Sequence, residues 1–360
     1  MSYTNGLDDP SAHFQTATYA GNGSTQSITN DGNSDLQPDW VWTKSRSDSS
    51  FHLVTDSTRG TSKRIYSNSE SAEESHSNMV TAFNSDGFSI GSHSAINTNN
   101  YNYVGWQWKA NGGTTASNTV GDIDSVVQAN TDAGFAIVTY TGNGSANQTI
   151  GHGLGAVPKM VLFKNRSSGQ YWYVYHVATG NDTMTYLNLS NAAQSLSSQF
   201  STPTTTTFNV SNENSTFSGY NTSGNTYVAY VFADVQGYSK FGKYVGNGNV
   251  NGPFVYLGFQ PAWLLLKRSD SATGGNWHII DNKRSASGGA NVNIYSITAN
   301  TADAESTGEA ESTYGVDFLS NGFKIRASHS TRNTSGGTYI YMAFAESPFV
   351  TSTGIMGTAR

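Results

Sequence analysis

The sequence predicts an all-β protein made of three tandem β-sandwich domains of a jelly-roll or lectin-like type. Three observations predict this fold class. Short apolar runs alternate with turns rich in Gly, Asn and Ser along the 360 residues, and helical periodicity is nearly absent. Aromatic residues are as frequent as charged ones, at 12% each, which is not typical of a disordered chain. One ordered set of five motifs occurs three times.

The five motifs follow one another in the same order in each copy. The first is a strand with a Gly-Asn-Gly turn: TATYAGNGS, IVTYTGNGS and FGKYVGNGN. The second is a proline and an apolar strand that ends in lysine: PDWVWTK, PKMVLFK and PAWLLLK. The third is a strand led by an aromatic residue, at Phe51, Trp172 and Trp277. The fourth is FSI, FNV or FKI, and the fifth is a closing strand, YVGWQWKA, YVAYVFAD or YIYMAFAE. Biased composition does not produce such an order, so we infer three homologous domains at residues 1–118, 119–236 and 237–360.

The motifs also predict how each domain is built. Alternation in IVTYTG and FSIG places the apolar residues on one face of a strand, whereas WVW, MVLF and WLLL are typical of strands buried on both faces. The Gly-Asn-Gly segments suit tight hairpin turns that need positive φ. SESAEES (69–75) and SNAAQSLSSQF (190–200) are interpreted as loops or single helical turns. We expect the closing strand to pair with the strand after the proline, because these two strands are the most apolar. Each copy is then its own sandwich.

Charge and composition argue against several classes of partner. The net charge is −6 and no basic tract occurs, which disfavours a nucleic-acid partner. The absence of cysteine excludes disulfides and thiolate metal sites. The N-terminal segment does not resemble a secretory signal, and every apolar stretch is far shorter than the roughly 20 residues of a membrane-spanning helix. We therefore expect no membrane insertion.

No arrangement of titratable residues in the sequence indicates catalysis or metal binding. His52 and His278 follow the aromatic residue of the third motif, but the middle copy has Tyr173 there, which favours a structural role. Asp56 and Asp281 occupy matching places, and the middle copy has no acid, so a glycosidase pair is disfavoured. NDGNSD (30–35) is rich in oxygen ligands, yet a polar turn is favoured over a calcium loop. We expect no catalytic residue, no metal and no cofactor.

Aromatic side chains are the remaining candidates for a binding or interface site. The strands carry more Tyr and Trp than a small core needs, and alternation places Trp106 and Trp108 on one face of their strand. Core or subunit packing is the favoured role, and contact with a glycan is the alternative. The candidate residues are Trp106, Trp108, Tyr101, Tyr103, Trp172, Tyr173 and Tyr175.

The segments YTGNGS, IGHGLGAVPKMVLFK and YVAYVFA, together with the ending FAESPFVTSTG, resemble an uncharacterised repeat domain in virion proteins of tailed bacteriophages, especially marine ones. Such proteins are described as structural, tail-fibre or adhesin-like. The resemblance implies a non-enzymatic virion protein that is made in the host cytoplasm and contacts other virion proteins, with a homo-oligomer expected and a host surface glycan as a further candidate partner.

The sequence lacks the heptads of a long stalk, so a compact appendage is the favoured form: a capsid knob or decoration, or a short tail-associated adhesin. A carbohydrate-binding, lectin-like module protein is the alternative. The first copy departs most from the shared pattern, because it alone has NDGNSD and the pair Trp106 and Trp108. We therefore expect the first copy to be the anchor.

Overall fold

The computed structural model describes residues 7–181, 183–195, 201–212, 218–284, 292–307, 310–351 and 354. It confirms the predicted fold class, because these residues form antiparallel sheets arranged as β-sandwiches. The jelly-roll or lectin-like type remains a prediction. The helices described are single turns: η1 (Pro10–Ala12), α1 (Ser94–Asn97), η2 (Ser218–Tyr220) and α2 (Glu311–Tyr314). No helix in the described ranges is long and apolar enough to cross a membrane.

The first repeat consists of a large and a small sheet. The large sheet has the order β1 (Phe14–Ala20), β9 (Asn102–Trp108), β3 (Trp40–Ser45), β4 (Leu53–Asp56), β5 (Lys63–Tyr66) and β6 (Glu74–Ser75). The small sheet has the order β2 (Gln26–Ile28), β8 (Phe88–Ile90) and β7 (Val80–Phe83). SESAEES is a loop that runs into β6, which agrees with its interpretation from the sequence.

The second repeat has the same plan with two added strands at one edge. Its large sheet has the order β10 (Ala116–Asn118), β11 (Ser125–Asn130), β12 (Phe135–Thr141), β19 (Thr226–Phe232), β14 (Met160–Asn165), β15 (Tyr173–His176), β16 (Thr183–Tyr186) and β17 (Gln194–Ser195). Its small sheet pairs β13 (Gln148–Gly151) with β18 (Thr207–Val210). Because β10 pairs with β11, the strands of this repeat begin at Ala116, slightly before the expected boundary. The end of SNAAQSLSSQF, residues 196–200, lies outside the described residues.

The third repeat completes the series. Its large sheet has the order β20 (Ser239–Val245), β27 (Thr338–Pro348), β22 (Phe259–Arg268), β23 (Trp277–Asp281) and β24 (Ile297–Thr298). Its small sheet has the order β21 (Phe254–Tyr256), β26 (Gly322–Ile325) and β25 (Val316–Leu319). In each repeat the closing strand lies beside the strand after the proline, as predicted: β9 beside β3, β19 beside β14, and β27 beside β22.

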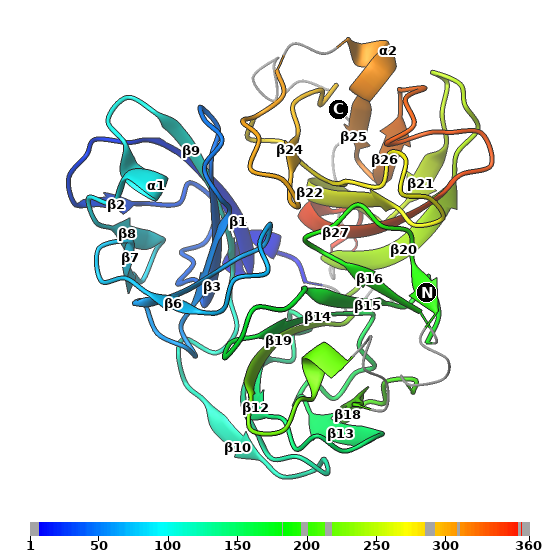
Figure 1. Ribbon diagram of the computed structural model, residues 1–360. Coiled ribbons are helices and arrows are strands. Elements are labelled where there is room, and N and C mark those ends of the chain that lie inside the picture. Colours follow the sequence, from blue (N-terminus) through cyan, green and yellow to red (C-terminus); the bar gives the residue numbers. More distant parts are fainter. Residues whose placement is uncertain are drawn as a thin grey trace.

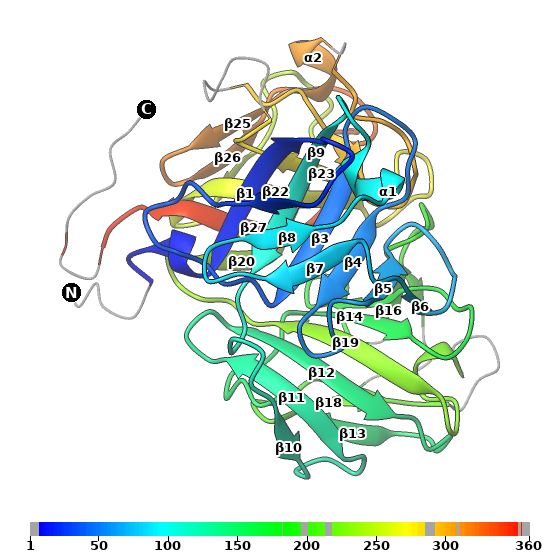
Figure 2. The same ribbon diagram turned by 90° about the vertical axis from the view of Figure 1, so that its left-hand side faces the viewer.

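The three repeats surround a common centre. Figure 1 shows three lobes whose large sheets face inward, with the small sheets on the outside. In the view turned by 90°, the small sheet of the first repeat lies in front of β1, β9 and β3 (Figure 2). Because side chains alternate along a strand, each large sheet has apolar residues on both of its faces, and each face packs into a different core. Trp40 and Trp42 of β3 point into a central core that all three repeats share, whereas Val41 points into the core of its own sandwich.

Each copy is its own sandwich of two sheets, as predicted, and the repeats also share the central core, which the motifs did not predict. All seven tryptophans of the chain lie in it, together with apolar residues from the large sheets of every repeat. Each repeat also has a smaller core between its own two sheets. A single repeat taken alone would therefore expose the inner face of its large sheet to water.

The Gly-Asn-Gly segments form corners and do not form hairpins. After β1 the chain passes from the large sheet to β2 of the small sheet, and the other repeats do the same. The second glycine of the motif has positive φ, for example 70° at Gly23 and 76° at Gly144. The first glycine is needed for close approach, because a Cβ atom on Gly142 would lie 2.4 Å from the carbonyl oxygen of Thr222.

A buried asparagine locks each of these corners. The side-chain oxygen of Asn221 accepts from the backbone N–H of Asn143 at 3.1 Å, and its amide donates to the carbonyl oxygen of Ser145 at 2.7 Å. Asn97 and Asn333 make the same contacts in the first and third repeats. The asparagine begins a motif, Asn-Thr-x4-Tyr, that recurs in all three copies and that the sequence analysis did not identify.

Candidate functional site

The aromatic residues predicted as a surface site in the first repeat lie mainly in the interior. Trp106 and Trp108 are fully buried in the central core, and the Trp108 ring lies 5.4 Å from that of Trp263 in the third repeat. Tyr103 is buried as well and stacks on Tyr19. Only Tyr101 of this group is exposed, at 36%. The exposed aromatic surface that suggested the first copy as an anchor is therefore absent, because these tryptophans join the repeats to one another.

The candidates in the second repeat are also buried. Trp172 lies in the central core. Tyr173 and Tyr175 lie in the core between the two sheets of the second repeat. None of these three side chains presents a face to a partner or a glycan. Their role is packing, which was the favoured interpretation from the sequence.

The junctions between repeats are the most elaborate polar sites among the described residues. A first set of hydrogen bonds runs around the centre in one direction. The Trp172 indole N–H donates to the Tyr66 carbonyl oxygen at 2.7 Å, and the Trp277 indole N–H donates to the Tyr186 carbonyl oxygen at 2.7 Å. His52 completes the ring through Nε2, which lies 3.1 Å from the Thr298 carbonyl oxygen. The second repeat thus binds the first, the third binds the second, and the first binds the third.

The role of His52 corrects the alignment of the third motif. Strand register places Val54, Val174 and Ile279 at the same position, opposite Trp42, Leu162 and Leu265. His52 therefore matches Trp172 and Trp277, and it does not match His278. The Trp42 indole donates to Nδ1 of His52 at 3.0 Å, so the ring carries its proton on Nε2 and donates from there. Burial holds the pKa of His52 well below its ordinary value, which keeps the ring neutral.

A second set of contacts also closes around the centre. The Tyr230 hydroxyl donates to Asp56 at 2.7 Å, and the Trp106 indole donates to Asp281 at 2.8 Å. In the third repeat, Met342 occupies the position of these donors and has no N–H or O–H. His176 lies where the other repeats have Asp56 and Asp281, and its Nε2 reaches the Tyr341 carbonyl oxygen at 3.0 Å. The middle copy has a histidine and no aspartate at this position, because the group that it contacts in the third repeat is a carbonyl oxygen, which accepts a hydrogen bond.

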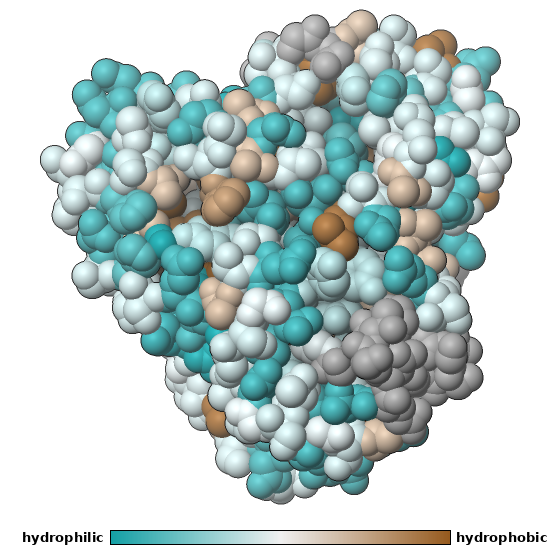
Figure 3. Space-filling view, viewed as in Figure 1, coloured by the Kyte–Doolittle hydropathy of each residue, from teal (hydrophilic) through white to brown (hydrophobic). Residues whose placement is uncertain are grey.

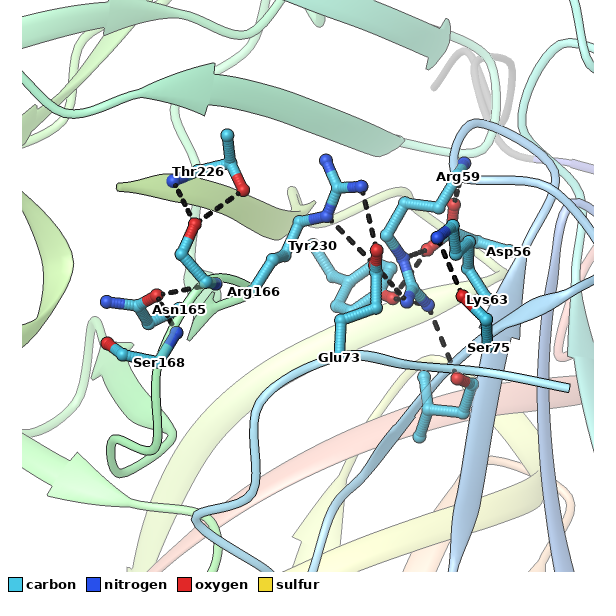
Figure 4. Close-up of polar contacts among 12 residues, drawn as sticks. Asp56, Arg59, Lys63, Glu73, Ser75, Asn165, Arg166, Ser168, Thr226 and Tyr230 are labelled. Carbon is cyan, nitrogen blue, oxygen red and sulfur yellow. Dashed lines mark hydrogen bonds and ion pairs between the residues drawn. The ribbon is translucent and has the colours of Figure 1, made fainter. Parts of the chain in front are cut away.

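An ion network surrounds the second set of contacts at the junction of the first and second repeats (Figure 4). Arg59 lies between Asp56, at 2.5 Å, and Glu73, at 3.0 Å, and Glu73 also binds Arg166 of the second repeat at 2.9 Å. Burial alone would lower the pKa of Arg59, and the neighbouring acids raise it above its ordinary value. The four charges cancel, as buried charges must if they are not to cost several kcal/mol each.

The same network occurs at the junction of the first and third repeats. Arg284 binds Asp281 and Glu305, both at 2.6 Å, and Glu305 binds Arg46 at 2.8 Å. The third junction has no such ion network among its described residues, since Ala193 and Ser269 stand at the matching positions. Its backbone contact is retained, because the N–H of Ala193 donates to the Ser269 carbonyl oxygen at 2.8 Å. The equivalent bonds, from Glu73 to Arg166 and from Glu305 to Arg46, close a third ring.

The lysine that ends the second motif is a further structural element of the large sheets. Lys44, Lys164 and Lys267 are buried, and each ammonium group donates to backbone carbonyl oxygens. The Lys164 ammonium reaches across the first junction to the Glu70 carbonyl oxygen at 2.8 Å. Burial lowers the pKa of Lys164 and of Lys267 to about 7, and that of Lys44 to about 8.

Several charged side chains in the described part of the chain form ion pairs that connect different elements. No group of three His, Asp or Glu side chains suited to a metal ion occurs within it. The NDGNSD loop has a structural contact, because Asp31 binds Lys283 of the third repeat at 2.8 Å. Apolar residues are scattered singly over the face seen in Figure 3, among polar ones. The described junctions therefore fix the three repeats relative to one another.

The sequence showed that three copies exist, but it did not show these rings. Trp172 was identified only as an aromatic candidate, and Arg59 and Arg284 were not identified. The Ser-, Ala- and Thr-rich surroundings of Glu73 and Glu305 predict a solvated surface, and this prediction is wrong, because both side chains are enclosed in ion pairs with arginines at the junctions. A signal was available in the pairs Asp56–Arg59 and Asp281–Arg284, which share a spacing of three residues in two copies.

No curated protein and no solved structure matches the chain. One family model, described as a domain of unknown function (DUF7483), matches residues 9–348 and so spans all three repeats in a single match. The chain belongs to this DUF7483 family.

Proposed function

We propose that the chain is a non-enzymatic structural protein of a bacteriophage virion, a compact surface appendage such as a capsid knob, a decoration or a short tail-associated adhesin. The resemblance of its repeat motifs to virion proteins of tailed phages suggests this class. The observation that carries the proposal is the closed arrangement of three repeats around a core that contains every tryptophan of the chain. A large shared core with paired internal charges favours a rigid body that persists outside cells.

The charged residues favour a structural over a catalytic role. Two buried carboxylates, Asp56 and Asp281, each bind an arginine of their own repeat and accept a hydrogen bond from an aromatic side chain of another repeat. A catalytic acid or base needs access to a substrate. These groups are enclosed at junctions, where they hold the repeats together.

The test is to locate the chain on purified phage particles. Antibodies raised against the purified protein are applied to particles from cells infected by the phage that encodes it, and bound antibody is visualised with gold in the electron microscope. We expect label at regular positions on the capsid or tail, with no label on particles of an unrelated phage. A chain found only in the particle-free lysate would contradict the proposal.

A carbohydrate-binding protein is the second candidate. It is favoured by two exposed aromatic side chains, Phe254 and Tyr256, on the outer edge strand of the third repeat. These residues differ from the aromatic candidates chosen from the sequence, which are mostly buried. A carbohydrate-binding role is compatible with a place on a virion, since an adhesin needs a surface ligand.

A further inference from the structure

We infer that the outer edge of the third repeat, formed by Phe254, Tyr256 and the adjoining groove, is a binding site for a saccharide. The inference goes beyond the structural role proposed above. It rests only on the part of that proposal in which the protein contacts the surface of a host cell. The three repeats are internal controls for one another, so a feature that one copy alone carries on its surface needs an explanation other than the shared fold.

The edge strand of the small sheet is equivalent in all three repeats. Ile28, Ile150 and Val255 each lie opposite the phenylalanine of the fourth motif. The residue before this position is Ser27, Thr149 or Phe254, and the residue after it is Thr29, Gly151 or Tyr256. Two copies thus have small or polar residues at both places, and the third copy has two aromatic rings.

Both rings are exposed and lie on one face of the strand. Phe254 is 46% exposed and Tyr256 is 54% exposed, whereas Val255 between them is buried. Residues two apart on a strand are separated by roughly 6.6 Å and point the same way. β21 pairs only with β26 among the described strands, so the rings form an open platform at the sheet edge.

The platform continues into a groove at the connection between the second and third repeats. The groove has a volume of about 520 Å³ and is lined by Tyr256, Asp234, Gln236, Ser239, Lys240 and Phe349, among others. This volume lies within the range of small-molecule sites, about 300–1,000 Å³. Asp234 and Gln236 are exposed in it. The Lys240 ammonium lies 5.4 Å from the centre of the Tyr256 ring.

These groups match the chemistry of a sugar. A pyranose ring has an apolar C–H face that packs on an aromatic ring, and hydroxyl groups at its rim that both donate and accept hydrogen bonds. Tyr256 and Phe254 supply the flat apolar surface. The Asp234 carboxylate accepts hydrogen bonds, the Lys240 ammonium donates them, and the Gln236 amide does both. A protein partner would need a broader apolar centre than two rings within polar surroundings.

Substitutions taken from the first repeat give a precise test. The double variant F254S/Y256T gives the edge strand of the third repeat the same two residue types, serine and threonine, that the first repeat has at Ser27 and Thr29. The fold of the first repeat already accommodates these residue types at these two positions. The full chain, this variant and the control V120T are applied to an array of bacterial capsular and lipopolysaccharide O-chain oligosaccharides. Val120 is 65% exposed and belongs to the second repeat, away from the platform. Circular dichroism and the melting temperature verify that each variant is folded.

We expect the full chain and V120T to bind the same saccharides, and F254S/Y256T to bind them at least tenfold more weakly while its melting temperature is unchanged. Binding by F254S/Y256T equal to that of the full chain would overturn the inference, and so would an absence of binding to every saccharide of the array. If sedimentation shows a dimer that F254S/Y256T abolishes, the platform is a subunit contact and the inference is overturned. The location of the chain on phage particles, measured by gold labelling, does not depend on saccharide binding. The two experiments therefore test the virion role and the saccharide site separately.

Discussion

At the scale of the residue, one position shows how different side chains perform the same task. His52, Trp172 and Trp277 occupy equivalent places, and each donates a ring N–H to a backbone carbonyl oxygen of another repeat. The imidazole can replace the indole because Trp42 occupies its other nitrogen, which fixes the tautomer. What the fold requires at this position is a buried ring that donates a hydrogen bond.

The hydrogen bond of Trp277 can be separated from the volume of its ring. Trp277→Phe removes both part of the ring and the donor to the Tyr186 carbonyl oxygen. Trp263→Phe is the matched control, because the Trp263 indole is equally buried and its N–H has no partner among the described residues. We expect Trp277→Phe to lower the free energy of unfolding by about 1 kcal/mol more than the control does, measured by urea denaturation. Equal losses would show that the bond contributes nothing to stability.

We expect His176 to make the stability of the fold depend on pH. Burial lowers its pKa to about 4, compared with an ordinary value of 6.5. Its Nδ1 accepts from the N–H of Ala178, so protonation would place two donors against each other. The unfolded chain binds the proton more readily, so the free energy of unfolding should fall as the pH falls from 6.5 toward 4, by about 1.4 kcal/mol per pH unit at most. His176→Gln, which cannot titrate, should reduce this slope in urea denaturation at pH 7 and pH 4.5; an unchanged slope would assign the effect to other groups.

At the scale of the element, the Gly-Asn-Gly corner is the most repeated unit of the chain. It takes each repeat from its large sheet to its small sheet, and the buried asparagine of the Asn-Thr-x4-Tyr motif fixes it in place. The two tyrosines beside it stack at 4.9 to 5.2 Å in all three copies. The corner is therefore a rigid part of each sandwich.

The first glycine of the corner should not tolerate a methyl group. Gly142→Ala would place Cβ 2.4 Å from the Thr222 carbonyl oxygen and 3.0 Å from the Tyr227 ring. We expect a loss of about 1–3 kcal/mol in the free energy of unfolding, because the corner must shift to relieve the overlap. Gly169→Ala is the control, since the nearest atom there lies 3.5 Å away, and it should change stability by less than about 0.5 kcal/mol. A similar loss in both variants would contradict the steric explanation.

At the scale of the whole molecule, the three repeats pack together as one body. Each repeat contributes at least one tryptophan to the central core, and three sets of hydrogen bonds close around the centre. Removing one repeat would break two junctions and expose the inner faces of the other two large sheets. The single family match over residues 9–348 agrees with a unit of three repeats.

Calorimetry tests this cooperativity. We expect a single unfolding transition for the full chain, with equal calorimetric and van't Hoff enthalpies, because the central core exists only when all three repeats are folded together. A truncated chain of residues 116–360 should lack this transition and bind a hydrophobic dye, since the inner faces of its sheets are uncovered. Three separate transitions, or a truncated chain that melts like the full one, would show that the repeats are independent domains.

The number of repeats, their all-β character and the pairing of the closing strand with the strand after the proline could all be predicted from the sequence. These features follow from local patterns, namely alternation, turn residues and repeated order, which are visible wherever a strand is built. The sequence also identified Trp106, Trp108 and Trp172 as unusual, and favoured packing as their role. It did not predict where the rings of these residues lie, because an aromatic residue that alternates with others looks the same on an outer face and on an inner one.

Which residues the inner face of each large sheet packs against depends on how the three repeats assemble. Trp106 meets Asp281 across 175 residues of sequence, and Tyr230 meets Asp56 across 174. Such contacts depend on the packing of the three repeats around a common centre, which no local pattern encodes. Phe254 and Tyr256 lie on the outward face of the small sheet of the third repeat, where the sequence showed only two more aromatic residues in a strand. Burial is a property of the assembled repeats, so the sequence determined the parts of this protein and the tertiary structure decided which of them remain free to bind.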